Sequence, residues 1–511
     1  MTIRRVRAAG KIVDGLGRLS WAVLLVCMAA METGCGSNPT ARGSGSSGST
    51  TVTILSTSTA NDQLSAFAMV LNSLTLTDES GATINLLSTP LDVEFMHVNG
   101  TTEPLLTESV PQGVYVSATA TAGIAGFACV GLNPSGSDSL TISYFEDATG
   151  PDATVNLPAP ITITGANMGL LLDLLVSESA SWTSCSSSGS YSITPTFSLR
   201  SEAISSKPTN STNGMEAGLK GVVASVNPSG GSLTVTSADG SWCEPVGAGC
   251  GAAVNGPVWK VVSNGNAVYQ GISGISQLAA GMPVEMDASL QPGGSLQATR
   301  IAVYDNNASD LTLAIGPLTE QSSADVGYPD FSTFPVEELA LGPLPRIGWS
   351  IPFSFSASTT FQVSSQLSNL QDLPFPASFS SANMVAGQNF YATTHALSIS
   401  AAPTDLPATT VTLIPQTING TVSAIGSDGG FTAYTVTLAP YDLFPQLAVQ
   451  SGQATLLTNP NTVVVYADDN TQILNTNPIA VGSVVRFYGL VFNDNGTLRM
   501  DCAQINDGVP E

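Results

Sequence analysis

Gly218-Leu-Lys-Gly-Val-Val-Ala-Ser-Val-Asn-Pro-Ser-Gly-Gly-Ser-Leu-Thr-Val235 begins a stretch that ends near Tyr304 and whose plan returns towards the C-terminus. There the corresponding segment reads Gly420-Thr-Val-Ser-Ala-Ile-Gly-Ser-Asp-Gly-Gly-Phe431. In both segments a Gly-Gly pair separates two runs in which apolar and polar residues alternate. This pattern predicts two β-strands joined by a tight turn.

A second segment centred on a glycine occurs at a similar distance from the start of both copies. The step from Gly221 to Gly281 is 60 residues, and the step from Gly420 to Gly482 is 62. Between these copies, Val385-Ala-Gly-Gln-Asn-Phe-Tyr391 fills the place of this segment in a third, diverged copy. Self-similarity at a fixed period indicates a repeat architecture. A period near one hundred residues is too long for a solenoid, so we predict three successive small domains.

Each copy is expected to form a small Greek-key β-barrel of the OB type, because two opening and two closing strands must close within about a hundred residues. The copies resemble a small barrel domain of unknown function that occurs in tandem in bacterial secreted proteins. The predicted boundaries are 218–304 for the first barrel, 310–415 for the second and 416–511 for the third. A polar linker is expected over residues 205–217.

Residues 51–204 predict a β-sandwich, since short alternating runs such as Ala66-Phe-Ala-Met-Val-Leu-Asn-Ser-Leu-Thr-Leu-Thr77 are separated by turn signals. The apolar run from Asn167 to Val176 has the composition of a helix or a strand, and its context favours a buried strand. Through Phe67–Asp78 and the Val110-Pro-Gln-Gly-Val-Tyr115 turn, this segment resembles an immunoglobulin-like or prealbumin-like domain found at the start of many bacterial lipoproteins. The resemblance implies no known activity.

Residues 1–35 have the pattern of an export signal, in which a basic segment leads into the eleven apolar residues of Trp21–Met31. That run is too short to span a bilayer, which takes about 20 residues. The following Thr-Gly-Cys35-Gly resembles the lipobox of bacterial lipoproteins, in which the cysteine is acylated, although Glu32 departs from the family pattern. Ordinary cleavage of the signal is the alternative. Residues 36–50 predict a flexible Gly/Ser tether.

Acidic residues dominate the charge, with 38 Asp and Glu against 14 Lys and Arg and a net charge of -24. Such a chain repels phosphate backbones, which argues against nucleic acid as a partner. Only 10% of the residues are charged, whereas 43% are hydrophobic. This composition favours folded domains with a polar, weakly charged surface over a disordered chain.

Two disulfides are predicted, because an exported chain permits them. Cys243 and Cys250 flank a short loop, and Cys129 and Cys185 form the second candidate pair. Neither pair has histidine or further cysteine at zinc-ligand spacing, and no metal or cofactor is expected. Tryptophans are candidates for stacking on a sugar ligand, with burial in the barrel core as the alternative. The candidates are Trp182, Trp242, Trp259 and Trp349, of which Trp242, beside the Cys243 loop, and Trp259 are favoured.

No catalytic site is expected. The two histidines, His97 and His395, lie in different domains and have the sequence surroundings of strand residues, without a nucleophile elbow nearby. The Asp/Asn clusters at Asp305–Asp310 and Asp468–Asn470 have the oxygen content of calcium loops, but turns use the same residues.

The sequence therefore predicts an all-β protein, with an N-terminal β-sandwich followed by three OB-like β-barrels. We expect a non-catalytic cell-envelope lipoprotein, anchored at Cys35 in the outer membrane because Gly36 rather than Asp follows the cysteine. It would bind polysaccharide or an envelope protein. The alternatives are a passive envelope spacer, a secreted protein, and a secreted carbohydrate-active enzyme.

Overall fold

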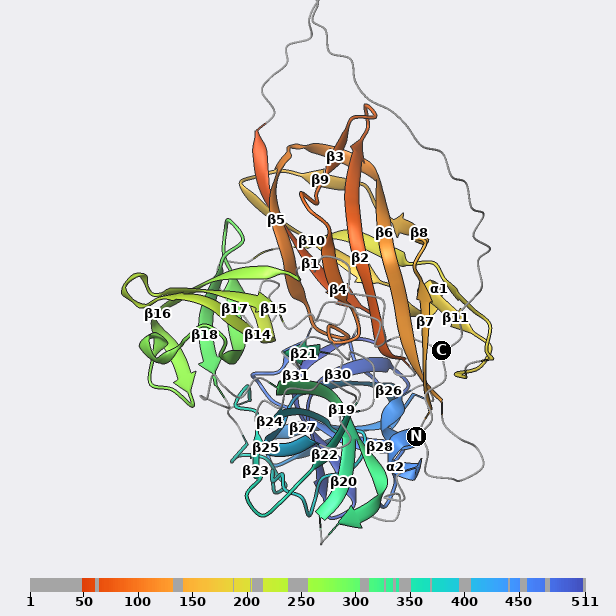
Figure 1. Ribbon diagram of the computed structural model, residues 1–511, viewed down its shortest axis with the longest axis vertical. Helices are drawn as coiled ribbons and strands as arrows, with labels where there is room; N and C mark the ends of the chain where they lie inside the picture. Colours follow the sequence, from red (N-terminus) through yellow and green to blue (C-terminus); the bar gives the residue numbers. More distant parts are fainter. Residues whose placement is uncertain are drawn as a thin grey trace, which may run out of the picture.

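The computed structural model describes residues 48–59, 64–131, 141–186, 188–202, 204, 215–237, 256–303, 312–325, 328–333, 337–339, 351–367, 370–394, 406–439, 442–450, 457–473 and 478–508, with the backbone alone between 312 and 352. The described chain is nearly all β, as predicted. Its strands form a sandwich followed by three small barrels (Figure 1). Among the described residues, no helix is long and apolar enough to cross a membrane.

The N-terminal sandwich contains eleven connected strands. One layer has the order β5-β1-β10-β13-β8, and the other is built on β2 and β6, with β3, β4, β7 and β9 at their sides. β8 pairs with both β13 and β6 and so joins the two layers. The bounds are β1 Ser49–Ser58, β2 Leu64–Asp78, β3 Thr83–Asn85, β4 Leu91–Glu94, β5 Glu103–Pro111, β6 Gly113–Gly131, β7 Thr141–Asp147, β8 Asp152–Asn156, β9 Ile161–Ile163, β10 Asn167–Leu174 and β13 Thr196–Glu202.

Alternation along these strands builds the sandwich core. Ile54 and Leu172 come from one layer and Phe67 and Phe127 from the other, and all four are buried in one cluster. The segment from Asn167 is the buried strand β10, as predicted, and it pairs in parallel with β1. A one-turn helix and a two-stranded hairpin stand beside the sandwich; they are α1 (Val176–Ser179), β11 (Ala180–Trp182) and β12 (Tyr191–Ile193).

The first barrel is closed by β14, β15, β16, β18 and β17 in that order. β16 and β18 are parallel, and every other pair in the ring is antiparallel. This connectivity is that of an OB-type Greek-key barrel. β14 begins at Met215, inside the predicted linker, so the predicted start at 218 was too late. The bounds are β14 Met215–Asn227, η1 Pro228–Gly230, β15 Ser232–Ser237, β16 Val258–Gln270, η2 Ile275–Gln277, β17 Pro283–Leu290 and β18 Leu296–Ala302.

The second and third barrels repeat this ring. In the second it runs β19-β20-β22-β25-β24, and in the third β26-β27-β28-β31-β30, each closing on its first strand. The parallel pairs are β22 with β25 and β28 with β31. The bounds are β19 Thr312–Asp325, β20 Tyr328–Thr333, β21 Glu337–Leu339, β22 Ile351–Ser354, β23 Thr360–Val363, β24 Asn389–Thr394, β25 Leu406–Leu413, β26 Gln416–Asp428, β27 Phe431–Leu438, α2 Leu443–Gln450, β28 Thr462–Ala467, β29 Gln472–Ile473, β30 Val484–Asp494 and β31 Thr497–Asp507.

The four domains pack against one another instead of following each other as separate beads (Figure 1). Leu55 and Leu171 of the sandwich belong to the core cluster of the first barrel. Phe390 of the second barrel shares a cluster with Phe492 of the third. Burial of apolar surface therefore holds the domain junctions together as well as the domain interiors.

Candidate functional site

Several residues singled out from the sequence lie outside the described residues. They are Cys35, Trp242, Cys243, Cys250 and His395, together with Trp349 and the cluster Asp305–Asp310. The predicted acylation site at Cys35, the predicted Cys243–Cys250 disulfide and Trp242 are therefore not part of the geometry below.

Cys129 and Cys185 form a disulfide that joins β6 to the segment between β11 and β12. Beside it, Trp182 of the hairpin packs on Phe127, with ring centroids 5.3 Å apart. Tyr191 packs on Phe145 at 4.7 Å. The disulfide and these rings attach the hairpin to the sandwich, so Trp182 serves as packing for this attachment.

Trp259 faces the interior of the first barrel and is only 3% exposed. Its indole Nε1–H donates to the carbonyl oxygen of Pro104 in the sandwich at 2.9 Å. The prediction of a ligand-stacking role for Trp259 is therefore wrong. Because Val258 and Val262 are apolar but lie on the outer face, the sequence of β16 does not alternate clearly between polar and apolar residues. Lys260 lies on the same outer face, and Trp259 and Val261 therefore lie on the inner face.

The Asp468–Asn470 cluster forms a turn. Asp468 Oδ1 accepts hydrogen bonds from the backbone N–H groups of Asn470 at 2.9 Å and Thr471 at 3.1 Å. Among the described residues, no group of three or more histidine, cysteine, aspartate and glutamate side chains could hold a metal ion. The turn interpretation explains this cluster without a ligand.

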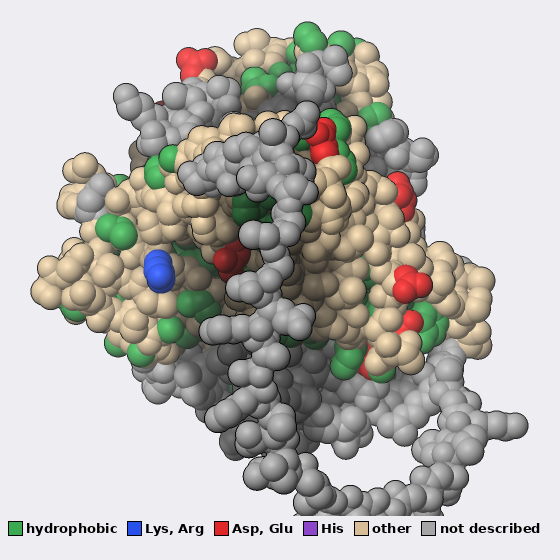
Figure 2. Space-filling model, turned by 90° about the horizontal axis from the view of Figure 1, so that it is seen from above, with side chains coloured by type: hydrophobic (Ala, Val, Ile, Leu, Met, Phe, Trp, Pro, Cys, Tyr) green, Lys and Arg blue, Asp and Glu red, His purple; other side chains and the backbone are tan. Residues whose placement is uncertain are grey.

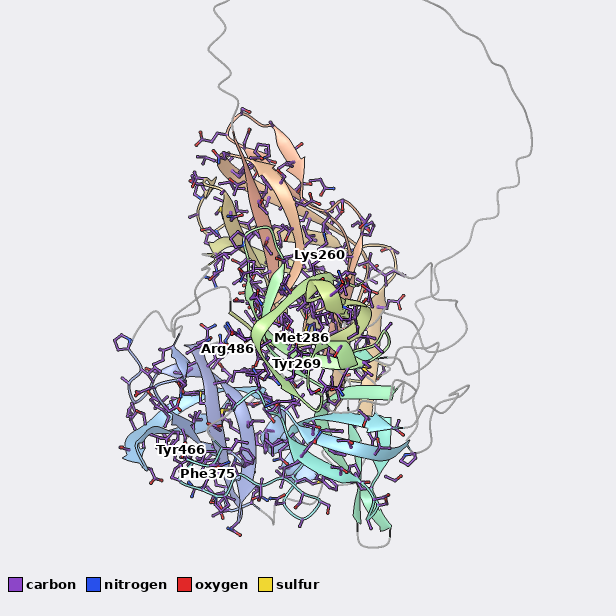
Figure 3. All side chains as sticks on the ribbon, turned by 90° about the vertical axis from the view of Figure 1, so that its left-hand side faces the viewer. Lys260, Tyr269, Met286, Phe375, Tyr466 and Arg486 are labelled. Atoms are coloured by element: carbon purple, nitrogen blue, oxygen red, sulfur yellow. A yellow bond between two sulfur atoms is a disulfide. The ribbon has the colours of Figure 1, made fainter. Side chains whose placement is uncertain are left out.

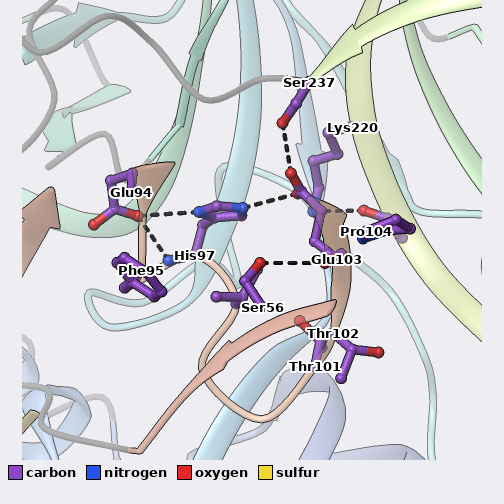
Figure 4. Close-up of polar contacts among 12 residues, drawn as sticks. Ser56, Glu94, Phe95, His97, Thr101, Thr102, Glu103, Pro104, Lys220 and Ser237 are labelled. Atoms are coloured by element: carbon purple, nitrogen blue, oxygen red, sulfur yellow. Dashed lines mark hydrogen bonds and ion pairs between the residues drawn. The ribbon is translucent and has the colours of Figure 1, made fainter. Parts of the chain in front are cut away.

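His97 lies in the turn after β4 and not in a strand, which corrects the expectation from the sequence. Its Nδ1 is 3.1 Å from Glu94 Oε2, and its Nε2 is 2.9 Å from Glu103 Oε2 (Figure 4). The histidine side chain is 5% exposed and the glutamates 0% and 5%. Glu94 also accepts the backbone N–H groups of Phe67 and Met96.

Three consecutive residues of the sandwich, Thr102–Pro104, bond three neighbouring strands of the first barrel. Thr102 donates its hydroxyl to Glu216 Oε2 in β14 at 2.7 Å. Glu103 Oε1 accepts the hydroxyl of Ser237, the last residue of β15, at 2.8 Å. Pro104 accepts the indole N–H of Trp259 in β16. We call this contact the sandwich–barrel junction.

Glu216 is the unusual member of this junction. It is 1% exposed, and its Oε1 has no hydrogen-bond partner among the described residues. Burial raises the pKa of Glu216 to about 7; the Thr102 hydroxyl opposes this shift, and the charges of Glu103 and Glu202 add to it. No sequence pattern points to Glu216, because its partners come from another domain.

A second buried network joins the first and second barrels. Arg300 in β18 contacts Glu285 and Asp287 of β17 in ion pairs, and its Nη1 donates to Ser365 Oγ at 3.0 Å. Ser364 donates to Glu285 at 3.0 Å. Burial acts to raise the pKa of Glu285, but Arg300 and Lys220 outweigh it and hold the pKa below its ordinary value.

Neither network has the arrangement of an acyl-transfer site. Ser237 donates to Glu103, whereas the imidazole of His97 lies between two carboxylates. A serine nucleophile needs a direct contact with its base. The contacts are those of interdomain networks, in which buried polar side chains of neighbouring domains bond one another.

The outer face of β15 and β16 is the open surface of the first barrel. Along this ribbon Ser232 pairs with Val262, Thr234 with Lys260 and Thr236 with Val258. Val258 is 55% exposed and Val262 38%. Lys260 points away from the barrel (Figure 3). On the face of the molecule that Figure 2 shows, charged side chains are few and the acidic ones lie apart from one another.

The equivalent face of the third barrel is covered. Phe375, from the segment 364–388 between β23 and β24 of the second barrel, packs on Tyr466 of β28 with centroids 5.2 Å apart (Figure 3). It also contacts Phe492 and lies 5.6 Å from the guanidinium of Arg499. Leu373, Phe379 and Met384 belong to the same buried cluster.

Comparison with known proteins identifies part of the chain. Residues 220–302, which form most of the first barrel, match the family described as Domain of unknown function (DUF5666). This match agrees with the resemblance of the repeats to a small barrel domain of unknown function. No curated protein matches the sequence. Among solved structures, the chain is similar to Drosophila Unr CSD456, with 11% identity over 58% of this chain and 99% of that chain and a TM-score of 0.13.

Proposed function

We propose that the chain is a non-catalytic lipoprotein of a bacterial cell envelope and that its first barrel binds a protein partner there. One contrast carries the proposal. The outer face of β15 and β16 is open in the first barrel, whereas Phe375 and its neighbours cover the equivalent face in the third. In OB folds the face of the second and third strands is a usual ligand surface.

The side chains on this ribbon favour a protein over a polysaccharide. Val258 and Val262 form a small apolar patch around Lys260, with serine and threonine hydroxyls beside it. An apolar centre with a polar rim is typical of protein–protein contacts. Saccharide stacking would need an exposed aromatic ring, and Trp259 faces the core. Polysaccharide binding is therefore the second outcome that the test below must distinguish.

The lipobox-like sequence at Cys35 supports the placement in the envelope, with the outer membrane as the proposed site and the sandwich as the immunoglobulin-like or prealbumin-like domain of such lipoproteins. The tether was predicted over residues 36–50, but β1 already begins at Ser49, so the folded part starts within its last two residues. Ser49 pairs with Pro111 at one end of the sandwich, while Ser58 at the other end of β1 accepts a hydrogen bond from Arg486 of the third barrel. An anchor would thus hold the sandwich near the membrane and point the barrels away from it (Figure 1).

Crosslinking in cells tests the proposal. A photo-crosslinking residue placed at position 258 of the full-length protein should capture one envelope protein. Val262→Asp in the same chain should abolish the capture, because it places a charge within the apolar patch. Val481→Asp is the matched control, since Val481 is 65% exposed but lies in the third barrel. An adduct with polysaccharide would change the partner class, and the absence of any adduct would overturn the proposal.

A passive spacer is the second candidate, and the buried networks across the domain junctions favour it. Arg300 with Ser365, and Arg486 with Ser58, fix neighbouring domains to each other. A spacer needs this rigidity but no open face. If the Val262→Asp protein restores the envelope of a deletion strain as well as wild type, the spacer function is supported.

A further inference from the structure

We propose that the sandwich–barrel junction is a proton-operated clamp, closed at acidic pH and loosened as the pH rises through neutrality. The proposal concerns the geometry of Thr102–Pro104 against the first barrel and does not depend on the identity of any partner. It rests on three observations about the groups at this junction.

The first observation is the environment of Glu216. The side chain is 1% exposed, and Thr102 supplies the one hydrogen bond that the described residues give to its carboxyl group. The charged groups that face it, Glu103 of β5 and Glu202 of β13, are both acidic. Arg200, which pairs with Glu202, is 55% exposed, and Lys220, which is buried in β14, donates to the carbonyl oxygen of Gly218. A charged Glu216 is therefore poorly compensated while the junction is closed, whereas a neutral one fits.

The second observation is the position of His97. Both of its ring nitrogens contact buried carboxylates, Glu94 on one side and Glu103 on the other. Only the doubly protonated ring can donate to both, because a neutral imidazole carries one N–H. Glu103 also holds Ser237 of the barrel. The ring thus holds Glu103 in place for its bond to the barrel.

The third observation is that the described hydrogen bonds across the junction come from one short segment, Thr102–Pro104. Thr102, Glu103 and Pro104 each bond one strand of the barrel, and Leu55 and Leu171 add apolar contact. The junction also joins two domains that each have a core cluster of their own. A change at one of these bonds can alter the contact without unfolding either domain.

The sign and size of the effect follow from linkage. With the junction open, Glu216 is expected to have the ordinary pKa of 4.5; with the junction closed, burial raises its pKa to about 7. The closed state binds the proton more tightly, so it is fully favoured below pH 4.5 and is penalised progressively up to pH 7. The closed-to-open ratio should fall roughly tenfold per pH unit in this window, about 300-fold in total, and then level off.

The Trp259 indole proton reports on the clamp directly, because it bonds Pro104 only when the junction is closed. Its exchange with solvent can be followed by nitrogen-15 NMR on the full chain, which has five tryptophans, with Trp259→Phe to assign the signal. After correction for the intrinsic exchange rate, protection of this proton should fall between pH 4.5 and 7 and level off above pH 7. Glu216→Gln, which is neutral at every pH, should give a flat profile.

Two further variants test whether the pH response comes from Glu216. Thr102→Val removes a hydrogen bond that favours the charged carboxylate, so the midpoint should move to higher pH. Glu178→Gln, at an exposed position of α1, should behave as wild type. A flat wild-type profile would show that no clamp exists. A profile that persists unchanged in Glu216→Gln would assign the pH response to another group and overturn the proposal.

Discussion

His97 Nε2 lies 2.9 Å from Glu103 Oε2, and both side chains are 5% exposed. The contact connects the turn after β4 with the start of β5. The other carboxylate oxygen of Glu103 accepts the hydroxyl of Ser237 in the first barrel. The histidine thus acts within the sandwich as a positioning residue for an interdomain bond.

Replacing His97 with glutamine should lower the free energy of unfolding by about 3 kcal/mol, because glutamine cannot contact Glu94 and Glu103 together as the imidazole does and so leaves a buried carboxylate without its hydrogen-bond partner. Urea denaturation monitored by circular dichroism measures the loss. In the double variant with Glu103→Gln the two losses should not add, since both changes remove the same contact. Additive losses would show that the pair does not interact.

The ion pair between Arg300 and Glu285 makes stability depend on pH with the opposite sign to the effect of Glu216 on the sandwich–barrel junction. The pKa of Glu285 lies below its ordinary 4.5, because Arg300 and Lys220 outweigh the effect of burial. This contribution to stability is therefore present above pH 4.5 and is lost as the pH falls below it.

Arg300→Lys should cost about 3 kcal/mol at pH 7, because one ammonium cannot reproduce the separate bonds of the guanidinium to Glu285, Asp287 and Ser365. Urea unfolding at pH 7, 5.5 and 3.5 should show the gap to wild type narrowing only at the lowest pH. A gap that is constant across the series would contradict the role of Glu285.

The repeat architecture could be predicted because its glycines have a backbone function. Gly281 and Gly482 have φ of 90° and 92°, and each donates its N–H at 2.8 Å, to Val223 and Val422 respectively. Gly387 of the diverged second copy also has a positive φ, of 100°. A residue other than glycine is strained there, so the sequence keeps a visible mark of the fold at these positions.

The junctions could not be predicted, because their partners are far apart in the chain. Ser237 and Glu103 are separated by 134 residues, and Trp259 and Pro104 by 155. No local pattern distinguishes a glutamate such as Glu216, which enters an interface, from one on a solvated strand. The inward orientation of Trp259 could have been predicted from the sequence, because the charged Lys260 is its neighbour in the strand and neighbouring side chains point to opposite faces.

Gly387→Ala should be more destabilising than Gly482→Ala. Both substitutions force a side chain into a positive-φ conformation, which costs about 1 kcal/mol. At Gly387 the new Cβ would also lie 2.8 Å from the ring of Phe444, whereas Gly482 has open space. Thermal denaturation of the two variants measures the difference. Equal losses would show that Phe444 moves aside without cost.

Phe375→Ala should uncover the third barrel's outer face. Phe375 is 6% exposed and contacts the rings of Tyr466 and Phe492. Removing a buried phenylalanine costs about 3–5 kcal/mol, and here the loss falls on the contact between the second and third barrels. The segment 364–388 should then separate from the third barrel more readily, and Tyr466 should become accessible.

Nitration of tyrosine, located by mass spectrometry, measures this exposure. Tyr466 should react faster in Phe375→Ala than in wild type. Phe355→Ala is the matched control, because Phe355 belongs to the same cluster and contacts Phe361 of the second barrel. It should lose stability without exposing Tyr466. If both variants expose Tyr466 equally, the cover depends on the whole cluster and Phe375 has no special place in it. If neither does, the face stays closed without Phe375, and the other residues of the segment suffice to keep the third barrel from acting as a ligand surface.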